Sequence, residues 1–491
     1  MTLYEDLKQQ LHEKGIDIIN EEYYEHIDEW KSWFQGNVDD FHFYNVKIAD
    51  GTEVECEKKT MNIAKKGAND MQKLLWSNKC SISLSTDEKT KKLWQVLDSK
   101  QNNFTIMFPQ MIEIACGLGT TAMTEYKDGL GRTRIEYIND PSVIVPYAYD
   151  NFNITGFITF DQWQETEGKK VIYYTHLIYH EFKTERDDNG ELKQVYRKYN
   201  ELYKSKDKNQ LGKEIPFETK FPDVEELVQY DTDTPHFQII KPPLANNLDI
   251  NSPMGISIFA NSIDKLKAID NKYDSFDMEF VDGKRRILVD KTALKGAPQV
   301  DEDGNISQQL FFDRNDRTYV AMNGMKDQPV KDISFDLRYK EHIDSINAEL
   351  NWYSSDLGFG EDYYRFDGTG RATATEILSQ NDDAFRTKQT FETVIKDVII
   401  DLVKVVCFLE DIQIEESEIQ IDFDYSRFEN QTATQQRLER EVNNGITSKV
   451  EYRMKVYGEE EDVARQKIEE IKKEEPSYGD MLGNNKEENE E

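Results

Sequence analysis

The chain is poor in cysteine and lacks a long apolar run, and both absences restrict where it can work. The most hydrophobic stretch is interrupted by Asp401 and Lys404, and the first residues, MTLYEDLKQQLHEKG, carry charge where a signal peptide would be apolar. Four cysteines stand at spacings that match no paired metal-ligand pattern: Cys56, Cys80, Cys116 and Cys407. We therefore expect reduced thiols in a cytosolic setting, and a protein that is neither secreted nor membrane-spanning.

The sequence also lacks the motifs of nucleotide- and metal-dependent enzymes. No GxxxxGK[ST] occurs, and Gly117-Leu118-Gly119 has no third glycine, so an ATP-driven motor is not expected and a packing or turn role suits these glycines. His176 and His180 have helical zinc spacing but stand in a β-forming stretch, where they would be roughly 13 Å apart. We predict no catalytic residue, no metal site and no cofactor.

Positive charge is scarce. The 491 residues include 95 acidic and 61 basic ones, a net charge of -34, which argues against a broad basic face that grips nucleic acid but not against DNA passing by. The most compact basic set is Lys284, Arg285, Arg286, Arg314 and Arg317. It is either a solvated strand face or a contact patch for an acidic partner or a phosphate backbone.

The patterns that are present predict an α+β protein, mostly α, with several domains. Residues 1–80 and 85–125 have helical periodicity, whereas residues 130–240 alternate as strands, with Asn189-Gly190 predicting a type I′ hairpin turn. A helix is expected from near Ile256 to Phe280, with carboxylates on its other faces. Strands and turns follow over residues 282–335, and a second helix over about 337–357.

A glycine-containing loop then leads into a long helix. Gly358, Gly360, Gly368 and Gly370 precede a stretch from Arg371 without glycine or proline, and Thr373 and Glu376 have capping-box spacing. An apolar stripe follows at Val394, Val398, Leu402, Val405 and Leu409. A strand is expected within residues 419–428, polar helices over about 432–444 and 447–475, and an unstructured acidic tail.

Five segments together resemble the portal proteins of tailed bacteriophages, of the siphophage type found with Gram-positive hosts. They are WKSWFQGNVDDFHFYNV (30–46), KTMNIAKKGANDMQKLLWSNK (59–79), NNLDINSPMGISIFANSIDKLKAIDNKYDSFDMEF (246–280), TATEILSQNDDAFRT (373–387) and NNGITSKVEYRMKVYGEEEDVARQKIEEIKKE (443–474). They span the chain from near its start to the acidic tail.

The resemblance implies a portal fold whose regions map onto the predicted elements. Residues 1–250 would form the wing, 251–281 the first stem helix, 282–336 the clip, 337–357 the second stem helix and 358–370 the tunnel loop. Residues 371–429 would form the long helix and a wing strand, 430–475 the crown and 476–491 the tail.

It also implies a ring, typically a dodecamer, at one vertex of the capsid, through which double-stranded DNA enters and leaves. The implied partners are the large terminase subunit, a head-completion or adaptor protein, and the major capsid and scaffolding proteins. The expected location is the virion, with the host cytoplasm during assembly, and no membrane is involved.

Three sets of site residues follow from this mapping. The first is a DNA-facing tunnel loop of Glu361, Asp362, Tyr363, Tyr364 and Arg365. The second is the basic set of Lys284, Arg285, Arg286, Arg314 and Arg317, placed in the clip for docking. The third is a stem wall that repels phosphates: Asp264, Asp270, Asp274 and Asp277. The rival interpretations are a metal-dependent nuclease or phosphotransfer enzyme, suggested by the many carboxylates, and a capsid scaffold without a channel.

Overall fold

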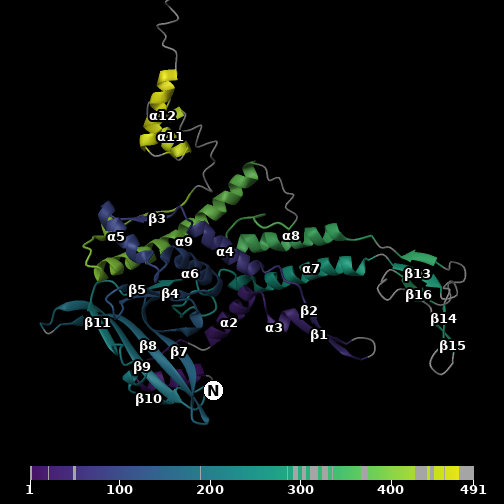
Figure 1. The fold of residues 1–491 in the computed structure, drawn as a ribbon, viewed down its shortest axis with the longest axis horizontal. Coiled ribbons are helices and arrows are strands. Elements are labelled where there is room, and N and C mark those ends of the chain that lie inside the picture. Colours follow the sequence, from purple (N-terminus) through teal and green to yellow (C-terminus); the bar gives the residue numbers. More distant parts are fainter. Residues whose placement is uncertain are drawn as a thin grey trace, which may run out of the picture. The chain divides into compact units, whose positions relative to one another are not determined.

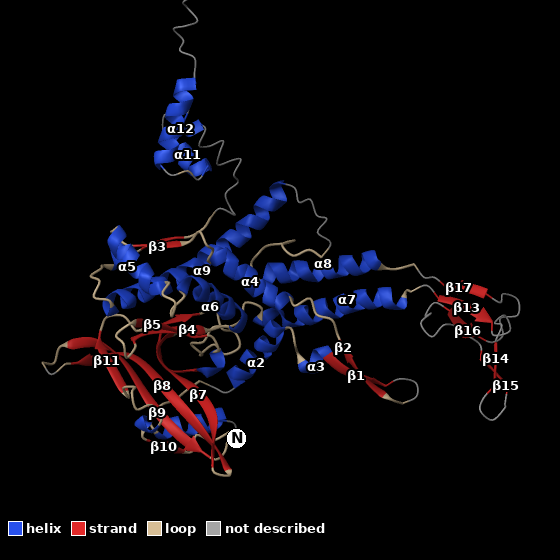
Figure 2. Cartoon of the chain, viewed as in Figure 1, coloured by secondary structure: helices blue, strands red, loops and turns tan. Residues whose placement is uncertain are grey.

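The computed structural model describes most of the chain as two compact units, Met1–Phe423 and Asp424–Glu491 (Figure 1). The described residues are 3–19, 22–47, 51–187, 189–284, 286–290, 297–300, 306–309, 319–322, 330–333, 336–366, 374–425, 440–442, 447–457, 459 and 461–474. Helices and strands both contribute extensively, so the predicted α+β class is confirmed (Figure 2).

The N-terminal part contains the helices that the periodicity predicts. They are α1 (Leu3–Glu13), α2 (Glu22–Gln35), α3 (Asp39–His42), α4 (Ile63–Leu75), α5 (Asp87–Leu97) and α6 (Phe104–Leu118). One face of α4 is buried through Ala64, Ala68, Met71 and Leu75, because these residues recur at steps of three and four. Gly117, near the end of α6, has its Cα against Phe34, where a Cβ would lie 2.5 Å from the ring. Its packing role is therefore confirmed.

The sequence predicted helix throughout residues 1–80, and the structure contradicts this prediction. A β-hairpin of β1 (Phe43–Lys47) and β2 (Glu53–Glu57) interrupts them. Its register pairs Tyr44 with Cys56 and Val46 with Val54, so these four side chains share one face, and the other face is polar except for Phe43. The alternation of apolar and polar residues over 43–57, with Gly51 at positive φ, is the strand signal that outweighs helical periodicity here.

The predicted antiparallel sheet region forms two sheets. The larger has the strand order β10-β9-β8-β7-β6, with β11 also pairing with β9, and the smaller has the order β12-β4-β5. The strands of these two sheets are β4 (Thr121–Lys127), β5 (Thr133–Ile138), β6 (Ile144–Asp150), β7 (Asn153–Glu167), β8 (Lys170–Arg186), β9 (Leu192–Ser205), β10 (Lys213–Ile215), β11 (Leu227–Asp231) and β12 (Phe237–Ile240). The short β3 (Ser81–Ser83) pairs with β18 (Gln420–Asp422).

The hairpin between β8 and β9 is present, but its turn is not type I′. Of the Asn189-Gly190 pair only Gly190 has positive φ, at 82°. The Gly190 amide donates to the Asp187 carbonyl and the Asp187 amide donates to the Glu191 carbonyl, which is the pattern of a turn closed by a bulge.

A small β module lies between two antiparallel helices in the order of the chain, as predicted. Helix α7 (Ile263–Asp282) begins seven residues later than expected, because residues 254–259 form a buried loop that precedes a 3-10 turn at Ala260–Ser262. Helix α8 (Tyr339–Asp356) agrees with its predicted range. The described strands between them are β13 (Arg286–Asp290), β14 (Ala297–Val300), β15 (Ile306–Gln309), β16 (Tyr319–Met322) and β17 (Val330–Ile333).

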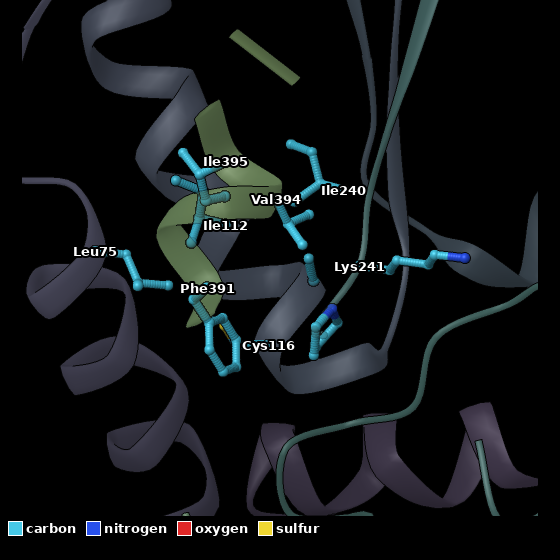
Figure 3. A pocket seen from close by; sticks show the side chains of 10 residues that line it. Leu75, Ile112, Cys116, Ile240, Lys241, Phe391, Val394 and Ile395 are labelled. Atoms are coloured by element: carbon cyan, nitrogen blue, oxygen red, sulfur yellow. The ribbon is translucent and has the colours of Figure 1, made fainter. Parts of the chain in front are cut away.

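The long helix α9 (Ala374–Leu409) has 36 residues and would span roughly 54 Å at ~1.5 Å per residue. Thr373, the predicted cap, lies outside the described residues. The stripe residues Val398, Leu402, Val405 and Leu409 are buried. Phe391 and Ile395 of α9 meet Leu75 and Ile112 around a pocket of about 10 Å³, while the Lys241 ammonium points away from it (Figure 3). A space this small holds at most a water molecule, so it is a packing junction rather than a ligand site.

The second unit contains α11 (Lys449–Tyr457) and α12 (Glu461–Glu474), so the helix predicted over 447–475 is two helices. Between them, Glu459 accepts hydrogen bonds from Arg453 and Lys467, which joins the two helices at their connection. Of the helix predicted over 432–444, residues 440–442 are helical and the remainder lies outside the described residues, as does the acidic tail 476–491.

Candidate functional site: the α7–α8 helix pair

Helix α7 carries a stripe of charged residues that fastens it to α8. Lys265, Lys272 and Glu279 are seven residues apart, which is close to two helical turns, so they lie on one side of α7. Lys265 pairs with Asp356, Lys272 Nζ lies 2.6 Å from Glu349 Oε1, and Arg338 Nη2 lies 2.8 Å from Glu279 Oε2. The hydrogen bonds from Arg338 lower the pKa of Glu279 to about 2. The pair is thus pinned along its whole length.

The opposite side of α7 is occupied by three of the predicted stem-wall carboxylates. Asp270, Asp274 and Asp277 each stand two residues from a member of the first stripe, about 200° around the helix. Asp274 accepts from the Lys59 amide at 3.1 Å, and Asp277 Oδ2 lies 2.8 Å from Lys59 Nζ. These contacts hold residues 58–61, which we call the base segment because they close the β1–β2 hairpin.

Asp270 corrects one prediction. It is 2% exposed, and its carboxylate accepts from Thr60 Oγ1 and from the Met61 amide, both at 2.8 Å, and lies 3.1 Å from His42 Nε2. A carboxylate satisfied inside the chain cannot present its charge to a channel. Its role as a repelling wall residue is therefore wrong, and it instead fixes the base segment on α7. Asp264 is exposed, as the wall prediction requires.

The predicted tunnel loop begins as a folded segment rather than as a free loop. Residues 359–366, which we call the return segment, run back along α8. The amides of Asp362, Tyr364 and Phe366 donate to Asn351 Oδ1 (2.6 Å), Ser354 Oγ (3.1 Å) and Asn347 Oδ1 (2.7 Å). The acceptors are spaced i, i+4 and i+7, so one side of α8 offers three polar side chains to the returning backbone.

Tyr364 and Tyr363 anchor this segment. Tyr364 is 5% exposed, its hydroxyl donates to Asp70 Oδ2 at 3.1 Å, and burial raises its pKa. The Tyr363 ring stacks on Phe359 with the ring centroids 4.4 Å apart. A DNA contact by Tyr364 is therefore excluded by its burial. Glu361, Asp362 and Arg365 remain exposed, and residues 367–373 lie outside the described residues.

These contacts place four elements in a row: base segment, α7, α8 and return segment. The acceptors on α8 stand two residues from Glu349 or Asp356, so the return segment lies on the side of α8 that is turned away from α7. Figure 2 shows the same order, with β1–β2 beyond α7 and the return segment beyond α8. The row therefore has two different flanks.

The helix pair also has one free face, opposite the buried residues Leu266, Ile269, Ile346 and Leu350. Its exposed residues are Asp264, Asn271, Ser275, Met278, Glu341, Asp344, Ala348, Trp352 and Ser355. Three are carboxylates, and two lysines, half-buried Lys267 of α7 and exposed Lys340 of α8, lie at the edges of the face, which is acidic on balance. Such a face would repel a polyanion rather than bind it, because nucleic-acid affinity comes from phosphates neutralised by lysine and arginine.

The predicted docking set is only partly described. Lys284 is exposed just after the end of α7, and the Arg286 backbone belongs to β13, which pairs with β16 and β17. Arg285, Arg314 and Arg317 lie outside the described residues.

The histidines do not point to a metal. The His176 ring lies 3.0 Å from Asn200 Oδ1, and His180 lies 2.8 Å from the Tyr196 hydroxyl. Burial lowers the pKa of both. In the part of the chain that the structure describes, no group of three or more His, Cys, Asp or Glu residues could hold a metal ion, and no helix has the length and apolarity needed to cross a bilayer.

The sequence analysis predicted neither the three polar acceptors on α8 that bind the return segment nor the role of the base segment. Asn347, Asn351 and Ser354 fall at helical spacing just before a glycine-containing loop, which is a visible signal for a segment that folds back. Lys58 and Lys59 carry no such signal, since their importance depends on residues about 215 positions away.

Comparison with known proteins gives a family. The family model described as phage portal protein, SPP1 Gp6-like, matches residues 14–478. No curated protein matches the chain. Solved structures that match include the neck of a native gene transfer agent (GTA) particle with C12 symmetry, at 11% identity and a TM-score of 0.37, and the virion of a native GTA particle, at 9% and 0.37. The neck of an empty GTA particle with C6 symmetry matches at 11% and 0.38. Each match covers 80% of this chain and 88% of the other.

Proposed function

Because the chain belongs to the SPP1 Gp6-like family of phage portal proteins, we propose that its copies form a ring at one vertex of the capsid, through which double-stranded DNA is packaged and ejected. The family match over residues 14–478 is the observation that carries this proposal. The protein acts as a structural conduit and not as an enzyme. It resides in the virion after assembly in the host cytoplasm, and a dodecamer is the expected ring.

The free face of the α7–α8 pair supports a channel-lining role for these helices. It carries Asp264, Glu341 and Asp344 and is long enough to border a channel, since α7 has 20 residues, or roughly 30 Å at ~1.5 Å each. A wall of this kind keeps DNA mobile, because a conduit that bound phosphates would stall its cargo. Of the predicted tunnel-loop residues, Glu361, Asp362 and Arg365 are exposed and therefore available for a contact outside their own chain.

The β module between the two helices is assigned to docking. Lys284 and Arg286, with Arg285, Arg314 and Arg317, would form a basic contact for the large terminase subunit during packaging and for a head-completion or adaptor protein afterwards. The other partners are the major capsid and scaffolding proteins. We assign α7 and α8 to the stem, the β module to the clip, α9 to the wing, residues 367–370 to the rest of the tunnel loop and residues 430–475 to the crown.

Electron microscopy of the purified full-length chain tests the ring directly. Class averages are expected to show a ring with a central hole, and a compact monomer at all concentrations would contradict the proposal. A parallel assay of magnesium-dependent DNA and ATP hydrolysis addresses the nuclease alternative. No turnover is expected, and hydrolysis by the chain alone would refute a purely structural role.

A further inference from the structure

The two flanks of the helix row carry opposite charges. At the return segment, Glu361 and Asp362 are exposed, and the Asp362 side chain is 51% accessible; Arg365 Nη1 lies 3.8 Å from Asp362 Oδ1, so Glu361 carries the uncompensated negative charge of the turn. At the base segment, the Lys59 side chain is 57% accessible but its ammonium pairs with Asp277, so the uncompensated charge is that of Lys58, which is half-buried with Nζ 3.8 Å from the centroid of the Phe41 ring. Among the described residues, Lys58 has no carboxylate within ion-pair distance. The acidic flank and the basic flank therefore face away from each other across α8 and α7.

Both flanks lie at the same height along the helices. The return segment bonds to α8 between Asn347 and Ser354, and the base segment bonds to α7 between Asp270 and Asp277. The ion pair of Lys272 with Glu349 joins the middles of these two stretches. Two copies standing side by side with parallel helices would consequently bring the acidic flank of one next to the basic flank of the other.

We propose that the acidic turn at Glu361 and Asp362 of one copy docks on Lys58 and Lys59 of the next copy around the ring. This inference rests on the proposed ring and names the surfaces that close it. A contact between two different surfaces repeats head to tail, so it generates a ring rather than a symmetric pair. Charge complementarity selects a second copy over DNA as the occupant, since phosphates would be repelled by the acidic turn.

The basic flank also offers apolar area, which an interface needs because exposed ion pairs alone contribute little. An open pocket beside the base segment is lined by Phe43, Tyr273, Lys58, Lys59 and one carboxylate, Glu57, among others. The β1–β2 hairpin continues from it, with Tyr44, Val46 and Val54 on one face at 43%, 40% and 41% exposure. An isolated two-stranded hairpin is marginally stable in water, so covering this face in the ring would also stabilise the hairpin.

The attachment of both flanks to the helices fits an interface role. The base segment is held by Asp270, Asp274 and Asp277, and the return segment by three side chains of α8. Both surfaces are fixed before contact, which lowers the entropy lost on association.

Charge reversal in the full-length chain tests the contact. Glu361→Lys and Lys58→Glu are each expected to raise the concentration at which half of the chain is in rings by about tenfold or more, because like charges would face each other at every interface. Mass photometry over a dilution series measures this concentration. Glu191→Lys, on an exposed turn of the large sheet, is the matched control and should assemble like the wild type.

Two rescues make the test specific. The double variant Glu361→Lys with Lys58→Glu restores complementary charges at every interface and should assemble as the wild type does. An equimolar mixture of the two single variants should also form rings, since alternating copies are complementary on both flanks. Thermal unfolding of each variant shows whether it is folded.

The outcomes separate this inference from the ring itself. If the wild type forms no ring, the proposed function fails. If the wild type forms rings and the single variants do so equally well, or if neither rescue restores assembly, the flank contact is wrong. Unchanged assembly of Glu361→Lys together with tighter DNA binding would reassign the turn to the channel.

Discussion

Glu125 and His236 are buried titratable residues beneath α9, and their environment makes both neutral near pH 7. Glu125 on β4 is 1% exposed and accepts from Gln238 Nε2 at 3.2 Å, and burial raises its pKa to about 8. His236 is fully buried between the rings of Tyr196 and Tyr230, and burial lowers its pKa to about 4. These two buried titratable groups beneath the long helix are therefore uncharged near pH 7.

The variant Glu125→Gln should make the protein more stable at pH 8 and leave it nearly unchanged at pH 4. The folded state keeps the Glu125 proton up to a pKa of about 8, whereas a free glutamate loses it near 4.5. Stability therefore falls as pH rises through this window, by an amount on the order of a few kcal/mol when complete. Unfolding midpoints measured across this pH range test the effect. Glu55→Gln, at an exposed position, is the control. The same pH dependence of the midpoint in Glu125→Gln and in the wild type would contradict the prediction.

At the scale of elements, α8 organises its surroundings through sides of different chemistry. Its buried side carries Ile346 and Leu350, one polar side pairs with α7, and the other binds the return segment. The three bonds to the returning backbone explain why residues 359–366 are folded although glycines precede and follow them.

Asn351→Ala is expected to loosen the return segment without unfolding the protein. Loss of the side-chain acceptor of the Asp362 amide costs about 1 kcal/mol, so the amides of Asp362, Tyr364 and Phe366 should exchange roughly fivefold faster with solvent deuterium. Hydrogen exchange followed by mass spectrometry measures this, with Ser355→Ala on the free face as control. Unchanged exchange in residues 359–366 would mean that the asparagine does not hold the segment.

At the scale of the whole molecule, a net charge of -34 and an acidic free face describe a protein that lets DNA pass. Only exposed carboxylates can repel DNA. Asp270 makes internal contacts, whereas Asp264, Glu341 and Asp344 remain exposed on the free face. The same acidity would keep free subunits apart, so specific contacts are needed to bring copies together.

Assembled rings of the variant Asp264→Lys with Asp344→Lys should bind DNA that the wild type releases. Each phosphate neutralised adds a slope of about -0.9 to the dependence of log affinity on log salt, so the gain should vanish at high salt. Fluorescence anisotropy with labelled duplex DNA over a salt series measures it. The same number of charges is reversed in the control Asp150→Lys with Glu191→Lys, on exposed sheet turns; equal binding by both variants would argue against a channel-lining face.

The sequence by itself determined the order of elements, the α+β class and the family resemblance. These follow from local periodicity and turn residues, as in the stripe of α9 and the β module between two helices, and short-range patterns encode them. It could not distinguish carboxylates that share a helix, since Asp264 and Asp270 look alike in the chain. Only the tertiary structure decided that Asp270 binds the base segment, that Tyr364 is buried and that the two charged flanks face apart, because contacts between residues hundreds of positions apart decide which charges stay free.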